Sequence, residues 1–105
     1  MPTRPVVAEH SSLVRWSAAP SVSVAVRDCE TVLLDVRAGA YYVLNETGGA
    51  IWAALRRGGG VGATLGEVLE ALVAEYDAPA ERIAPDVVAL LARWEGDRLV
   101  RRVSP

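Results

Sequence analysis

The spacing of apolar residues changes once along this chain, near Asn45, from the period of two typical of strands to the period of 3.6 typical of helices. Before Asn45, Val22, Val24 and Val26 alternate with small residues. With 105 residues, the chain is long enough for one core. Strands followed by helices therefore predict an α+β domain, in which the helices cover one face of a small antiparallel sheet.

Three strands are expected before Asn45, at residues 21–26, 31–37 and 40–44. Gly39 precedes the third strand, and glycine takes the positive φ that a tight hairpin turn needs. In the second strand, the residues expected to face the core are the apolar ones at alternate positions: Val32, Leu34 and Val36. Both faces of the third strand are apolar or aromatic.

The first of three expected helices begins near Thr47 and ends at the glycines of residues 58–60, which we interpret as a flexible link. The residues of this helix that are expected to point inward are Ile51, Trp52 and Leu55.

The second helix is expected to begin at a capping box formed by Thr64 and Glu67. The third ends at Gly96, with Pro85 in its first turn or at a kink. Residues 97–103 are expected as a terminal strand or a docked coil.

Residues 1–20 hold three of the six prolines and no sustained period. They predict an irregular arm, which leaves residues 21–103 as the folded domain. Trp16 is the exception within the arm, and we expect it to pack back onto the domain.

The composition excludes several kinds of chemistry. All 11 basic residues are arginine, so a Schiff-base lysine and a phosphate-loop lysine are both excluded. One histidine, His10, and one cysteine, Cys29, cannot form a zinc site or an internal disulfide. We expect no catalytic residue, no metal site and no cofactor.

Charge and hydropathy patterning narrow the class of partner. The net charge of −2 argues against binding driven by neutralisation of nucleic-acid phosphates. The longest apolar runs have six residues, whereas a membrane-spanning helix needs about 20. The first 20 residues also lack the apolar stretch of a signal peptide. We expect a cytoplasmic protein that contacts neither nucleic acid nor membrane.

A DNA-binding function is the alternative, because the second and third helices have helix-turn-helix spacing. The third helix carries Arg82 and Arg93, but also three carboxylates: Glu81, Asp86 and Glu95. A winged-helix transcription regulator is therefore the second hypothesis.

The third strand suggests a different function. In the order 1-2-3 it lies at the edge of the sheet, where charge or proline usually blocks pairing with another chain. Residues 40–44 contain neither. Such an edge beside a helix is suited to strand addition, in which an extended peptide joins the sheet.

A longer motif spans the second and third strands and the first helix. It reads LDxxxGxYYxLNxTGxxIW, and its residues are Leu34, Asp35, Gly39, Tyr41, Tyr42, Leu44, Asn45, Thr47, Gly48, Ile51 and Trp52. With this motif, the stretch from Thr31 to Val103 resembles the PqqD-like family of recognition elements for ribosomally synthesised, modified peptides.

The resemblance implies a winged helix-turn-helix-like fold: a three-stranded antiparallel sheet followed by three helices. It also implies a non-catalytic domain that binds the leader segment of a precursor peptide and presents it to a modifying enzyme. The small, free-standing chain is most similar to the B1 proteins of lasso-peptide pathways, which work beside a separate cysteine-protease-like leader peptidase. In the family the leader adds antiparallel to the third strand and lies against the third helix.

The candidate peptide-binding residues come from the third strand and the third helix. On the helix we favour residues on the face next to the core stripe, together with one member of the stripe. The full set is Ala40, Tyr41, Tyr42, Val43, Leu44, Arg82, Asp86, Ala89, Leu90 and Arg93. The expected groove has Tyr41 or Val43 as its floor, and its walls are Val87, Leu90 and Trp94. The sequence leaves open which alternate N–H groups of the third strand face the peptide.

Overall fold

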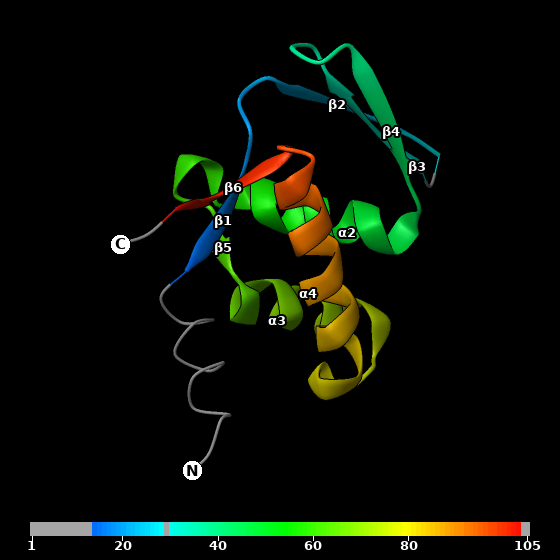
Figure 1. Cartoon of the computed structure of the whole chain (residues 1–105). Helices are drawn as coiled ribbons and strands as arrows, with labels where there is room; N and C mark the ends of the chain where they lie inside the picture. Colours follow the sequence, from blue (N-terminus) through cyan, green and yellow to red (C-terminus); the bar gives the residue numbers. More distant parts are fainter. Residues whose placement is uncertain (1–13, 29, 104–105) are drawn as a thin grey trace.

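The computed structural model describes residues 14–28 and 30–103 of the chain, so His10 and Cys29 lie outside the described residues. It contains two antiparallel sheets and three longer helices (Figure 1). The elements in chain order are β1 (Arg15–Ala18), β2 (Val22–Arg27), β3 (Glu30–Asp35), β4 (Ala40–Leu44), α2 (Glu46–Arg57), a 3-10 turn (Gly59–Val61), β5 (Ala63–Thr64), α3 (Leu65–Tyr76), α4 (Ala80–Gly96) and β6 (Val100–Val103).

The predicted α+β fold is confirmed. The three strands before Asn45 form a sheet in the order β2-β3-β4, with β4 at its edge as expected. The capping box of α3 is present, because Thr64 Oγ1 accepts the N–H of Glu67 while Glu67 Oε1 accepts the N–H of Thr64. Pro85 lies in the second turn of α4, so the first-turn alternative is wrong, and a kink at Pro85 stays a prediction.

The second sheet, in the order β5-β1-β6, changes the prediction for the N-terminal segment. An irregular arm is wrong for Arg15–Ala18, which form the central strand β1. A four-residue strand is too short to show a period, and its partners β5 and β6 lie far along the sequence. Trp16 is buried in this strand, which confirms that it packs on the domain.

The side chains of β3 face the opposite way from the prediction. Leu33 is fully buried, whereas Leu34 is 46% exposed and Val36 is 65% exposed. The reason is Asp35, whose buried Oδ1 accepts the N–H groups of Arg37 (3.2 Å) and Ala38 (3.4 Å) and closes the hairpin turn. This turn orients Asp35 inward, and Leu33 shares its face.

The glycines after α2 form a packed turn rather than an open link. Gly62 adopts a φ of 79°, and a Cβ there would collide with the carbonyl O of Trp16 in β1. A Cβ on Gly58 would likewise collide with the carbonyl O of Gly62. These close approaches hold the turn against β1.

The core lies between the three helices and the inner faces of the sheets. The predicted inward residues Ile51, Trp52 and Leu55 are all buried, as expected for α2. The rings of Trp52 and Trp94 meet edge to face, with centroids 5.4 Å apart, and so join α2 to α4. None of the described helices is long and apolar enough to span a bilayer.

Candidate functional site

A groove of about 420 Å³ runs between the edge strand β4 and helix α4. Its lining comes from β4, the start of α2 and the second half of α4. These residues are Tyr42, Val43, Leu44, Asn45, Gly48, Leu90, Arg93, Trp94 and Asp97.

The interior of the groove is apolar, and two of its exposed residues are charged. Leu44 and Trp94 are buried, and the contact of Trp94 with Trp52 fixes its ring. Arg93 and Asp97 are exposed and carry opposite charges. This arrangement accepts an apolar side chain from an extended segment and leaves the polar groups of that segment at the surface.

Asn45 lines the groove at the junction of β4 and α2. It follows β4 directly and caps α2, because its Oδ1 accepts the N–H of Gly48 (2.8 Å). A Cβ on Gly48 would lie 3.3 Å from both Asn45 Oδ1 and Leu44 Cβ, closer than ordinary contact. Glycine at this position keeps the junction of strand and helix compact.

One backbone hydrogen bond shows how β3 is oriented between its neighbours. The N–H of Val36 donates to the carbonyl O of Ser21, on the β2 side of the sheet (3.2 Å). Alternate residues of a strand direct their backbone groups to opposite neighbours. Leu33 and Asp35 therefore direct their N–H and C=O groups toward β4.

The same alternation identifies the free groups of β4. Leu33 lies opposite Tyr42, and Asp35 lies opposite Ala40. These are the hydrogen-bonded pairs, so Tyr41 and Val43 direct their N–H and C=O groups outward. Among the described strands, β4 pairs only with β3. The edge beside the groove thus offers regularly spaced donors and acceptors to a further strand.

The candidate residues divide into three groups. The groove brings together five of them: Tyr42, Val43, Leu44, Leu90 and Arg93. Ala40 and Tyr41 lie on the same edge strand but outside the groove lining, and Tyr41 is 70% exposed. Arg82, Asp86 and Ala89 are exposed on α4 and also lie outside that lining.

Three lining residues were neither candidates nor expected groove walls: Asn45, Gly48 and Asp97. Asn45 and Gly48 belong to the motif that joins the third strand to the first helix, which was the available signal. Trp94 was expected as a wall of the groove, and it serves both the core and the groove. Val87 was expected as another wall, but it is fully buried and lies outside the lining. Asp97 follows α4, where no periodic pattern marks it.

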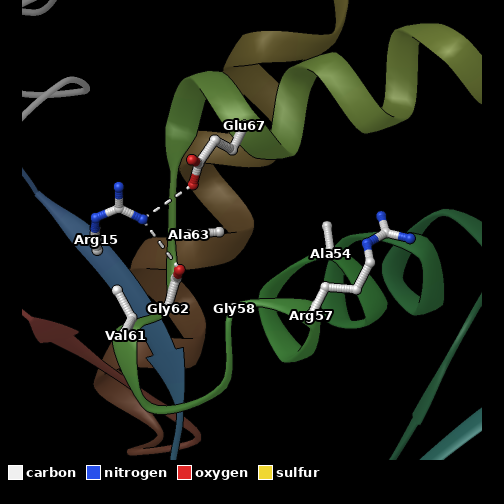
Figure 2. Close-up of a pocket in the computed structure, with 8 residues that line it drawn as sticks. All are labelled: Arg15, Ala54, Arg57, Gly58, Val61, Gly62, Ala63 and Glu67. Atoms are coloured by element: carbon white, nitrogen blue, oxygen red, sulfur yellow. Dashed lines mark hydrogen bonds and ion pairs between the residues drawn. The ribbon is translucent and has the colours of Figure 1, made fainter.

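A second hollow, of about 330 Å³, lies beside β1 and the glycine turn. Figure 2 shows Arg15 pointing toward Glu67 and the Gly62 carbonyl. Arg15 Nη1 donates to Glu67 Oε1 (3.2 Å) and to Gly62 O (3.3 Å). Because Glu67 also completes the capping box, these groups already bond to one another, and the hollow has a structural role. Within residues 14–28 and 30–103, no cluster of side chains suited to a metal ion is present.

The chain is similar to a known protein family. The family model described as Coenzyme PQQ synthesis protein D (PqqD) matches residues 30–100. Comparison with curated proteins gives no match.

Two solved structures are similar to this chain. One is TbiB1 in complex with the TbiA(beta) leader peptide, with 27% identity, a TM-score of 0.72, and coverage of 81% of this chain and 94% of that chain. The other is lasso peptide synthetase B1 complexed with the leader peptide, with 29% identity, a TM-score of 0.69, and coverage of 83% and 98%.

Proposed function

The chain belongs to the PqqD family, whose model covers residues 30–100, and we propose that it binds the leader segment of a ribosomally synthesised precursor peptide. The observation that carries this proposal is the free edge of β4 beside an apolar groove. Two similar solved structures, with the same overall fold, are complexes with leader peptides.

The leader joins the sheet as a fourth strand, antiparallel to β4. Every neighbouring pair in this sheet is antiparallel, and antiparallel pairing is slightly the more stable arrangement. The N–H and C=O groups of Tyr41 and Val43 bond to the peptide backbone. Alternate peptide side chains then point toward α4, where Leu44, Leu90 and Trp94 receive an apolar anchor.

The function is recognition and presentation rather than catalysis. We propose that the chain holds the leader for a separate cysteine-protease-like leader peptidase in a lasso-peptide pathway. The similarity of this chain to lasso peptide synthetase B1 supports this assignment. The groove itself offers an arginine and an aspartate at its surface, but no nucleophile beside a base.

Leader binding is expected at a dissociation constant of about 1 µM or tighter, with weak and salt-sensitive binding at most to duplex DNA. The physical reason is that backbone pairing and an apolar anchor act on the peptide, whereas a net charge of −2 does not attract phosphates. Fluorescence polarisation with both ligands measures the difference, using the leader of a precursor encoded beside this gene. Sequence-specific DNA binding tighter than leader binding would make the transcription-regulator hypothesis correct instead.

The purified chain is expected to leave its precursor peptide unchanged in mass. The test is overnight incubation followed by mass spectrometry, with a double variant, Cys29→Ala and His10→Ala, as the control. Cleavage that persists in the double variant would contradict the recognition-only function, because it could not be assigned to the single cysteine and histidine.

A further inference from the structure

Arginines from three separate segments gather around a hollow of about 550 Å³ at the Ala40 end of the sheet. Arg37 comes from the turn between β3 and β4, Arg98 from the turn after α4, and Arg101 from β6. All three are exposed, and none forms an ion pair with another residue in the described ranges. We call these three residues the arginine cluster.

The surroundings of the cluster leave its charge unbalanced. Glu95 also lines the hollow, but its Oε2 accepts a hydrogen bond from Nε of Arg102 at 2.6 Å. Arg102 lines the hollow too and lies over the ring of Trp16. The hollow therefore has a local excess of positive charge on a chain whose net charge is −2.

The backbone at Arg98 is a second, independent observation. α4 ends in a Schellman motif, in which the N–H of Arg98 donates to Glu95 O (3.1 Å) and the N–H of Leu99 donates to Trp94 O (2.9 Å). Arg98 has a φ of 62°, in the left-handed region that favours glycine or asparagine at this position. An arginine here is held at a cost to stability, which points to a use for its side chain.

The position of the cluster relative to β4 suggests what binds there. A peptide antiparallel to β4 starts beside Leu44 and leaves the sheet beside Ala40. The turn that carries Arg37 immediately precedes Ala40. In Figure 1 this turn lies at the top of the view, above the end of α4 and β6, and Arg37 lines the same hollow as Arg98 and Arg101. The residues that follow the docked strand therefore leave the sheet next to the arginine cluster.

We propose that the arginine cluster binds an acidic segment of the precursor peptide, directly C-terminal to the part of the leader that pairs with β4. This inference rests on the proposed function and adds a second, electrostatic contact to it. Several weak pairs between exposed charges would hold the departing chain and fix its direction along β4. A nucleic acid is the less suitable occupant, because its phosphates would extend beyond the three arginines over a chain whose net charge is −2.

The test uses three synthetic peptides: the leader ending at the docked strand, the same leader with a short tail of glutamates, and the same leader with a matched tail of glutamines. At low salt the glutamate tail is expected to bind about tenfold more tightly than the glutamine tail. At about 1 M salt, where screening acts over roughly 3 Å, the difference is expected to disappear.

Protein variants assign this difference to the cluster. The triple variant Arg37→Gln, Arg98→Gln and Arg101→Gln is expected to bind both tails equally. Arg57→Gln, a matched change at an exposed arginine of α2 on another surface, is expected to keep the full difference. Arg98→Gly separates binding from folding, because it should preserve or raise Tm while reducing the advantage of the glutamate tail about two- to threefold.

Failure of the two proposals gives different results. A leader without a tail that does not bind overturns the proposed function, and this inference with it. If that leader binds but the two tails bind equally to the unmodified chain, this inference alone is wrong. Duplex-DNA binding that the triple variant abolishes, with no difference between the tails, would assign the cluster to nucleic acid instead.

Discussion

Tyr42→Pro is expected to destabilise the domain by about 3 kcal/mol or more, the upper range of single substitutions, whereas Tyr41→Pro and Val43→Pro leave it folded but weaken leader binding. Tyr42 lies opposite Leu33 in a hydrogen-bonded pair, so proline there removes a bond of the sheet. Tyr41 and Val43 direct their N–H groups to the free edge, where proline removes only bonds to the peptide. Each lost bond costs about 0.5 to 1.5 kcal/mol, or roughly two- to tenfold in affinity, and the ring adds a steric cost.

Circular dichroism melts and leader titrations of the three proline variants measure both effects. Tyr41→Ala is the matched control, because it removes the same side chain but keeps the backbone N–H. Full affinity in every folded variant would exclude strand addition at this edge. If Tyr42→Pro stayed folded and Tyr41→Pro unfolded, the assignment would be the reverse: the N–H of Tyr41 would pair with β3 and that of Tyr42 would face the free edge.

Gly62→Ala is expected to destabilise the protein by about 3 kcal/mol or more, the upper range of single substitutions. The added Cβ would collide with the Trp16 carbonyl, which is backbone and held in β1, and φ at this position is 79°. A loss of this size lowers the Tm of a domain of this length by roughly 12 °C or more.

Two neighbouring glycines separate the causes. Gly60 has open space around it and no positive φ, so Gly60→Ala should change stability by less than about 0.5 kcal/mol. Gly59 also has open space but a φ of 58°, so Gly59→Ala measures the conformational term alone, about 1 to 2 kcal/mol. Equal melting temperatures for the Gly60 and Gly62 variants would contradict the packed glycine turn.

Local signals in the sequence predicted most of the elements. The edge strand Ala40–Leu44 has the bounds expected for it, because Gly39 and Asn45 mark its two ends. The capping box fixed the start of α3 in the same way. Each of these signals depends on residues within a few positions of one another, which a single sequence displays directly.

Signals that depend on distant partners were missed. β1 pairs with β5 and β6, and nothing within Arg15–Ala18 indicates those partners. The prediction of which β3 side chains face the core was wrong for another reason. Leu33 and Leu34 are both apolar, so either set of alternate residues could be the buried one. The choice between them depends on the buried turn at Asp35, whose carboxylate reads in the sequence as a surface charge.

The candidate site was predicted in outline. The strand and the helix that form the groove were both identified, but only some of the α4 residues predicted to line it do so. Leu90 and Trp94 line the groove as expected, whereas Val87, the third expected wall, is buried outside the lining. Arg82, Asp86 and Ala89 lie off the core stripe as expected, yet outside the groove lining.

The pairing of β1 with β6 also predicts an order in which the domain assembles. The hairpins β2–β3 and β3–β4 join segments close in sequence, and such contacts form early at a low cost in loop entropy. Trp16, by contrast, cannot complete its surroundings until β6 has been synthesised, because Trp16 lies opposite Arg102. We therefore expect β4 to belong to an early-forming unit and closure of the second sheet to be a late step of folding.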